Sequence, residues 1–412
     1  MSVKTKNFWP KLALFFAVIG PGIITALANN DAGGISTYSI VGARYGTQML
    51  WVLFLVTISL AITQEMGLRI GLVTRQGLSG VIRENFGLRW TAFAMVTILI
   101  ANLGTMASEF SGIAASFEIV GISKYITVPV AALIIWLVLY KGSFKTTQKI
   151  FLAFSALFVV YVINGFFIKP DFGEALTALV TPSVQWNTPF LITMIALIGT
   201  TITPWGQFFI QSYVVDKGLD EKNYKVQKFE AYLGSFLASF VAFFIVISTA
   251  TVLYKNGIDI HDAKDAALAL KPLVGNFAQL LFAFGLFCAS MLGAFILPVA
   301  TAYVICEAFG WEYGFNTNWQ TGKIFYSIIL FSIIFPALVV LIPGISLINV
   351  MLHAQNMNGI LLPVILIFVM KIINSKKIMG EHVNGPIGNI ISGLTIAGII
   401  LATVILVVSS FI

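Results

Sequence analysis

Apolar runs long enough to cross a lipid bilayer recur along the whole of this chain. The hydrocarbon core of a bilayer is about 30 Å thick, so a helix that spans it needs about 20 apolar residues. The 412 residues are 58% hydrophobic and 10% charged, and the mean hydropathy is +0.94. Soluble domains do not reach such values, and the gaps between the runs are too short to hold one. The sequence therefore predicts an all-α polytopic membrane protein, with a single transmembrane domain over residues 1–412.

Hydropathy predicts eleven spans, of which the first and the sixth are interrupted. Their approximate limits are 11–43, 46–74, 90–120, 124–141, 150–168, 187–217, 228–254, 270–308, 322–342, 346–373 and 388–411. Alternating the loops between the two sides places 18 of the 24 basic residues on one side and six on the other. By the positive-inside rule, we expect a multi-pass protein of the plasma (inner) membrane, with a cytoplasmic N-terminus and an extracellular C-terminus.

Other partners are not indicated. Cys288 and Cys306 lie in apolar sequence without metal-site spacing, so neither a disulfide framework nor a zinc site is predicted. The basic residues are spread through short loops, which argues against nucleic acid as a partner. We expect no cofactor, a lipid bilayer as the surroundings, and a chain that functions as a monomer.

The two interrupted spans predict the architecture. The first breaks at "NNDAGG" and the sixth at "TTITPWG", where Pro204 lacks an N–H group and Gly206 loosens the backbone. Five spans separate one break from the other, so the second set of five has inverted orientation. This layout predicts a five-plus-five inverted-repeat (LeuT/APC-type) transporter fold with helices 1 and 6 broken. The repeats cover about 11–168 and 187–373, and an eleventh helix covers about 388–411.

The chemistry of the breaks favours a hard cation. Asp31 places a carboxylate at membrane depth, which costs several kcal/mol unless a cation or a proton neutralises it. The alternative is a structural acid that caps a half-helix beginning near Ser36. The second break offers further oxygens, on Thr200, Thr201, Thr203 and Gln207. Oxygen ligands and water suit Mg²⁺, Ca²⁺ or Mn²⁺ better than copper or zinc.

These residues resemble the Nramp (natural resistance-associated macrophage protein) family of divalent metal transporters. The family's Asp-Pro-Gly-Asn in helix 1 corresponds to residues 31–34, and its Met-Pro-His-Asn in helix 6 to residues 203–206. The stretch "QEMGLRIGLVTRQGLSGVIRENFG" is similar to the family's helix 2 pattern. In "AQNMNGILLP", Gln355 stands eight residues before a proline and so matches the metal-site glutamine of the family.

Departures from the family pattern change the expected ion. The family's methionine, whose sulfur favours soft transition metals, is replaced by Thr203, and its helix 1 asparagine by Gly34, which leaves room for water. Mg²⁺ gives up its waters reluctantly and is usually bound through one or two carboxylates with several waters retained. The resemblance therefore extends to the Nramp-related magnesium transporters, a branch that carries Mg²⁺ and Mn²⁺ without proton coupling.

The family's proton route is also reduced in this sequence. Its three helix 3 acids align with Asn102, Glu109 and Gly112, and its helix 6 histidines with Trp205 and Ile210. Without titratable groups in series, stoichiometric proton coupling has no relay. Glu109 remains open between a residual proton or cation relay and a buried acid hydrogen-bonded to neighbouring helices. Trp205 could line the cavity, or it could fill the volume left by the missing polar groups. Either role places it beside the site.

The sequence thus predicts a transporter, not an enzyme, that takes up hydrated Mg²⁺, with Mn²⁺ also accepted, by alternating access. Asp31 supplies the charge. Oxygens come directly or through water from Thr200, Thr203, Gln207, Gln355 and carbonyls near Ala28 and Thr200, and Gly34, Trp205, Asn102 and Glu109 border the site. The nearest rival is a proton-coupled Mn²⁺ or Fe²⁺ importer. A sodium-coupled amino-acid transporter of the same fold is less favoured, because Asp31 would repel a substrate carboxylate.

Two further clusters have structural interpretations. Glu65 and Arg69 stand at i, i+4 spacing near the cytoplasmic end of the second span, where they are expected to pair. Residues 256–271 hold three aspartates within seven positions but lack the pattern of an EF-hand loop, so we interpret them as a solvated helix start.

Overall fold

The computed structural model describes residues 30–141, 159–216, 218–314 and 319–409, and their regular elements are all helical. Eight of the described helices are long and apolar enough to cross a membrane, and a ninth, Lys124–Tyr140, is shorter but apolar. Each of the eleven predicted spans contains a described helix, although the first and fifth are described only in their second parts. The polytopic all-α prediction is confirmed.

The first repeat contains α3 (Ala32–Tyr45), α4 (Leu50–Thr74), α5 (Leu78–Ile119), α6 (Lys124–Lys141) and α8 (Val159–Phe167), and α9 (Phe172–Ala178) follows it. The second repeat contains α10 (Thr188–Thr201), α11 (Pro204–Asp216), α12 (Tyr224–Val252), α15 (Ala278–Phe309), α16 (Lys323–Val340) and α17 (Leu347–Ile373). After it come α18 (Lys376–Met379) and α19 (Pro386–Ser409). Short turns fill the connections: η2 (Glu221–Asn223), η3 (Tyr254–Asn256), α13 (Ala263–Ala267), η4 (Leu268–Leu270), α14 (Lys271–Val274) and η5 (Gly275–Phe277).

Glycines explain two differences from the predicted limits. The third span was expected at 90–120, but its helix begins at Leu78 and changes direction at Gly87, where φ is +77°. The eighth span was expected from residue 270, but the long helix begins only at Ala278, after Gly275 with φ +57°. Residues with a Cβ rarely adopt such angles, whereas glycine does so freely. Hydropathy does not register these bends, because it averages over residues and carries no information on backbone angles.

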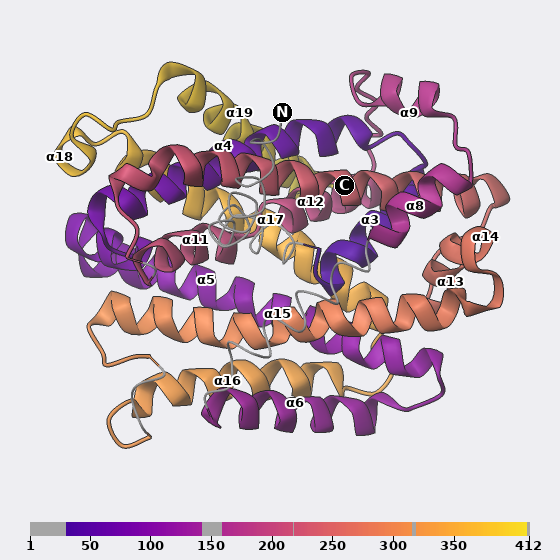
Figure 1. Cartoon of the computed structure of the whole chain (residues 1–412), viewed down its shortest axis with the longest axis horizontal. Helices are drawn as coiled ribbons and strands as arrows, with labels where there is room; N and C mark the ends of the chain where they lie inside the picture. The colour runs from indigo at the N-terminus through magenta and orange to yellow at the C-terminus, as the bar shows by residue number, and fades with distance from the viewer. Residues whose placement is uncertain (1–29, 142–158, 217, 315–318, 410–412) are drawn as a thin grey trace, which may run out of the picture.

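α3 lies at the centre of the bundle, against α12, α10, α17, α5 and α15 (Figure 1). Every residue of α3 except Arg44 is buried. α6 and α16 form one edge of the bundle in Figure 1, whereas α18 and α19 lie on the opposite side. Many apolar side chains of α19 remain exposed, as expected for a helix that faces lipid.

Glycines allow the central helices to approach closely. A Cβ atom on Gly199 of α10 would meet the carbonyl oxygen of Gln355 and would lie 2.7 Å from Cα of Gly359 on α17. A Cβ on Gly42 of α3 would overlap the α12 backbone at Val246. Small residues at such crossings are typical of membrane helix packing, where van der Waals contact replaces the hydrophobic effect. This packing brings the breaks of the two interrupted spans close to α17.

Candidate metal-binding site

Asp31 is the N-cap of α3. Its Oδ1 accepts a hydrogen bond of 2.7 Å from the backbone N–H of Gly34, and its side chain is buried. The helix begins at Ala32, so the expected start near Ser36 was wrong by about one turn. Asp31 lies directly at the N-terminus because an acidic cap satisfies N–H groups that have no partner within the helix. The capping interpretation therefore describes the geometry, and the carboxylate still lies among buried groups.

Glu109 of α5 lies beside Asp31. Its Oε2 accepts a long hydrogen bond of 3.4 Å from the backbone N–H of Ala32, the residue that follows Asp31. Gly293 of α15 makes room for it, because a Cβ there would lie 2.6 Å from Cδ of Glu109. Glu109 is thus hydrogen-bonded to a neighbouring helix, as one of its two interpretations predicts. Two buried carboxyl groups placed so close together favour a proton on one of them or a cation between them.

Gln355 of α17 borders the same point from the other side. A Cβ on Gly33 would overlap the side chain of Gln355, lying 2.6 Å from its Cδ, so Gln355 rests directly on the first turn of α3. Its Oε1 accepts a 2.9 Å hydrogen bond from Nδ2 of Asn358, which also donates to Thr105 Oγ1 at 2.8 Å. All of these side chains are buried. The match of Gln355 to a metal-site position therefore has a geometric counterpart beside Asp31.

The second break lies between α10, which ends at Thr201, and α11, which begins at Pro204. Thr201 Oγ1 is hydrogen-bonded to the hydroxyl of Tyr38 at 3.2 Å and so connects α10 with α3. Thr200 and Thr203 are both buried, and Thr200 Oγ1 has no hydrogen-bond partner among the described residues. The break predicted from Pro204 is confirmed, and the threonines around it are buried in the bundle interior.

On α11, Trp205 and Gln207 are also buried. The ring of Trp205 packs edge-on against Phe209, with a centroid distance of 5.7 Å. Gln207 Nε2 donates a long hydrogen bond of 3.5 Å to Thr63 Oγ1 of α4. The described hydrogen bond of Gln207 is thus with α4 rather than with α3.

The structure brings Asp31, Glu109 and Gln355 together around the first turn of α3. Asn102 is not part of this group: its Nδ2 donates to Thr301 Oγ1 at 2.8 Å, and it precedes Glu109 by seven residues, about 10 Å along the helix axis. Ala28 lies outside the described residues. Within the described ranges, no group of three or more His, Cys, Asp or Glu side chains is arranged to hold a metal ion.

Sequence reasoning missed three polar residues that position the site: Tyr38, Thr105 and Asn358. A pattern was present for the last two. Asn358 follows Gln355 by one helical turn, and Thr105 stands between Asn102 and Glu109 on the same face of α5. Polar residues at helical spacing inside an apolar run indicate a face that is turned toward other polar groups.

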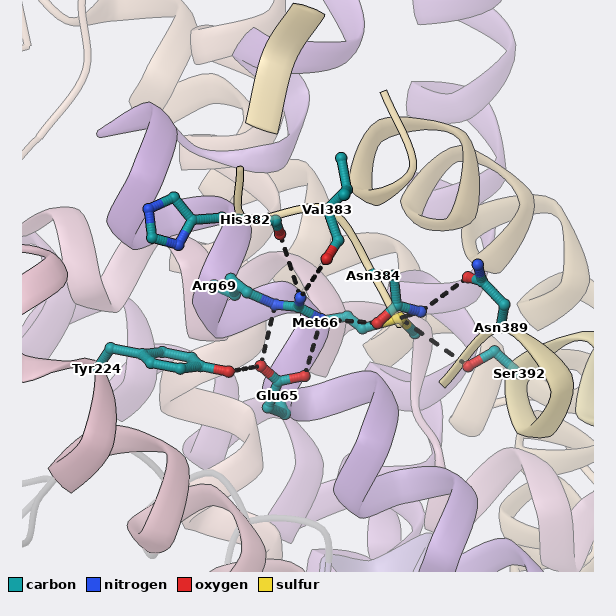
Figure 2. A network of polar contacts seen from close by, with 9 residues as sticks. All are labelled: Glu65, Met66, Arg69, Tyr224, His382, Val383, Asn384, Asn389 and Ser392. Carbon is teal, nitrogen blue, oxygen red and sulfur yellow. Dashed lines mark hydrogen bonds and ion pairs between the residues drawn. The ribbon is translucent and has the colours of Figure 1, made fainter. Parts of the chain in front are cut away.

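The predicted pair of Glu65 and Arg69 on α4 is confirmed and belongs to a larger network (Figure 2). Arg69 Nε lies 3.0 Å from Glu65 Oε1, and the same oxygen accepts a 2.5 Å hydrogen bond from the Tyr224 hydroxyl at the start of α12. Arg69 also donates to the His382 carbonyl and to Oδ1 of Asn384, in the segment before α19. The network therefore ties α4 to both α12 and α19.

Comparison with known proteins supplies the fold and the family. A solved manganese transporter of Eremococcus coleocola aligns with a TM-score of 0.78 at 18% identity, covering 99% of this chain and 88% of that one. MhsT in complex with L-phenylalanine aligns with a TM-score of 0.62 at 13% identity, covering 95% of this chain and 97% of that one. These likenesses confirm the predicted inverted-repeat transporter fold.

Sequence comparison agrees over nearly the full length. The divalent metal cation transporter MntH of Caldanaerobacter subterraneus is 23% identical over 406 residues, which cover 95% of this chain and 93% of that protein. The sequence profile described as natural resistance-associated macrophage protein-like matches residues 22–409. With this match over almost the whole sequence, the chain belongs to the Nramp family.

Proposed function

We propose that this protein takes up divalent cations by alternating access, that hydrated Mg²⁺ is its main substrate with Mn²⁺ also accepted, and that transport is not coupled to protons. Its relatives are named divalent metal cation transporters, and a structural neighbour is named a manganese transporter. The observation that carries the proposal is the buried carboxylate of Asp31, with Glu109 beside it, at the start of a half-helix in the bundle centre. An ionised Asp31 there attracts a cation into an apolar interior.

The polar side chains around the breaks favour a hard ion. In the proposed site, Asp31 binds the ion, and oxygens of Thr200, Thr203, Gln207 and carbonyls near Ala28 act directly or through water. Gln355 borders the site, and Gly34 leaves space for retained water. Hard oxygen donors and water are the ligands of Mg²⁺ and Mn²⁺, and a site with few direct ligands suits Mg²⁺ because this ion keeps part of its hydration shell.

We propose the absence of proton coupling because neutral residues stand where the family's proton route has titratable ones. Trp205 and Ile210 do not titrate, and Asn102 bonds to Thr301, another neutral side chain. The membrane potential alone is a sufficient driving force. It contributes about 2.3 kcal/mol per charge per 100 mV, hence roughly 4.6 kcal/mol for a divalent ion. A proton-coupled Mn²⁺ or Fe²⁺ importer is the alternative.

We further propose the arrangement in the membrane. The domain covers residues 1–412, works as a monomer in the plasma (inner) membrane, and has its N-terminus in the cytoplasm and its C-terminus outside. Helices 1 and 6 rock against the remaining bundle to expose the site to each side in turn.

The test is ion uptake into proteoliposomes under an inside-negative potential, with Mg²⁺ and Mn²⁺ compared and a pH dye inside. We expect uptake of both ions without a pH change, and its loss in Asp31→Ala. Asp171→Ala is the matched control. Asp171 also caps a helix, because its side chain accepts a hydrogen bond from the backbone N–H of Glu174, but it is exposed. Mn²⁺ uptake with stoichiometric acidification and no Mg²⁺ transport would establish the proton-coupled alternative instead.

A further inference from the structure

A chain of hydrogen bonds fixes which end of the Gln355 amide faces the site. Thr105 Oγ1 donates to the backbone carbonyl of Ala101 at 3.0 Å, so its hydroxyl proton is already used. The same oxygen accepts one proton of Asn358 Nδ2 at 2.8 Å. The second proton of Nδ2 goes to Oε1 of Gln355 at 2.9 Å. The order of donors and acceptors therefore begins at a backbone carbonyl and ends at Gln355.

This order determines the orientation of both amides. Because Thr105 acts here as an acceptor, Asn358 has to present its nitrogen. Because that nitrogen donates to Gln355, Gln355 has to present its oxygen to Asn358. Turning Gln355 alone would set two NH₂ groups against each other within the buried interface of α5 and α17, which costs about 1–3 kcal/mol per unpaired group.

The nitrogen of Gln355 consequently faces the first turn of α3. A Cβ on Gly33 would overlap this Nε2 atom, which shows how close it lies. Nε2 is fully buried and has no acceptor among the described residues. An NH₂ group cannot coordinate a cation, but it can donate to a carboxylate oxygen or to a water oxygen.

On the basis of the proposed function, we propose that Asn358, held by Thr105, is a positioning residue that presents Gln355 to the site as a hydrogen-bond donor instead of an ion ligand. The hydrogen bonds from Thr105 through Asn358 to Gln355, here called the relay, thereby remove one direct oxygen ligand from the site. An ion bound at Asp31 has to keep a water molecule on the side of α17.

This arrangement discriminates between ions by their readiness to lose water. Ca²⁺ takes six to eight oxygen ligands in flexible geometry, and amide oxygens are among them, whereas Mg²⁺ retains several waters. Withholding the Gln355 oxygen therefore disfavours Ca²⁺ more than Mg²⁺. If the relay is broken, Gln355 can turn its oxygen toward the ion, and Ca²⁺ gains a ligand.

The experiment measures Mn²⁺ uptake into proteoliposomes and the concentrations of Ca²⁺ and of Mg²⁺ that halve it. Asn358→Leu removes the donor at similar size, and we expect Ca²⁺ competition to strengthen roughly tenfold relative to Mg²⁺, the lower end for residues that orient metal ligands. Thr105→Val should shift the ratio in the same direction but less, because Asn358 keeps its bond to Gln355. Thr105→Ser keeps the hydroxyl and should retain the native ratio.

The double variant of Asn358→Leu and Thr105→Val should match Asn358→Leu alone, since both changes act on one relay. Asn374→Leu is the control: Asn374 is the C-cap of the same helix, about 24 Å further along, and bonds to Asn389. An unchanged ratio in Asn358→Leu, or an equal loss of competition by both ions, would overturn the proposal. If Mg²⁺ does not compete even in the native protein, the proposed substrate is wrong. The relay can still be tested by comparing the Ca²⁺ concentration that halves Mn²⁺ uptake with the Mn²⁺ concentration that gives half-maximal uptake.

Discussion

Replacing Gly33 with alanine tests whether Gln355 has to rest on the first turn of α3. The added Cβ would overlap Nε2 of Gln355 and would lie 2.6 Å from its Cδ, where ordinary contact begins at 3.4 Å, so this side chain has to withdraw by at least about 0.8 Å. Withdrawal breaks the bond from Asn358 and leaves a buried acceptor unpaired, which costs about 1–3 kcal/mol. Alanine in a helix offsets at most about 1 kcal/mol of this. We expect a net loss of up to about 2 kcal/mol.

Thermal unfolding in detergent and Mn²⁺ uptake measure the two consequences. Gly33→Ala should melt below the native protein and transport poorly. Gly104→Ala is the matched control, because its Cβ would meet the terminal methyl group of Met357, which can swing aside without losing a hydrogen bond. This variant should melt at or above the native temperature and transport normally. Equal melting and uptake in Gly33→Ala and the native protein would refute the reasoning.

Three further predictions concern other contacts. Tyr224→Phe removes the hydroxyl that donates to Glu65 and should lower stability by about 1.5–3 kcal/mol, measured by thermal unfolding. Although burial raises the pKa of Asp259, the hydrogen bond and charge of Arg44 lower it further, so the net pKa lies below 3.8. The pair therefore stabilises the protein above that pH and loses its contribution as the pH falls through the folded pKa. Arg44→Gln should cost about 0–1 kcal/mol at neutral pH and nothing in strong acid, in melting curves at both pH values. Glu109→Gln should retain Mg²⁺ uptake within a few fold, whereas its loss would make the ionised carboxyl group essential.

The spans and breaks could be predicted because they depend on local physics. Apolar length locates a membrane helix wherever it packs, and Pro204 interrupts hydrogen bonding by its own chemistry. The start of α3 was misplaced because the small residues after Asp31 were interpreted as part of the break. In the structure they form the first turn, and Gly33 is small there because Gln355 lies against it.

The arrangement of the site depends on contacts that no local pattern contains. Glu109 lies beside Asp31 because α5 passes α3 at the level where Gly293 leaves space. Asn102 was expected near the same break, yet its position two turns earlier on α5 places it against Thr301. The orientation of Gln355 depends on Thr105, which lies 250 residues away in sequence. Such relations follow from helix packing, which sequence periodicity does not determine.

The adjacent carboxyl groups of Asp31 and Glu109 make the direction of any proton movement informative about mechanism. With both groups buried side by side and no cation bound, a proton on one of the two relieves the repulsion between their charges. If an arriving ion expels this proton to the outside and a cytoplasmic proton replaces it after release, uptake exports protons and the liposome interior becomes alkaline. Symport acidifies the interior instead. The uncoupled transport proposed above therefore requires that Glu109 keep its proton while the ion occupies Asp31. A glutamine at position 109 reproduces that neutral state permanently, so retained uptake in Glu109→Gln and a steady internal pH are two consequences of one protonation state.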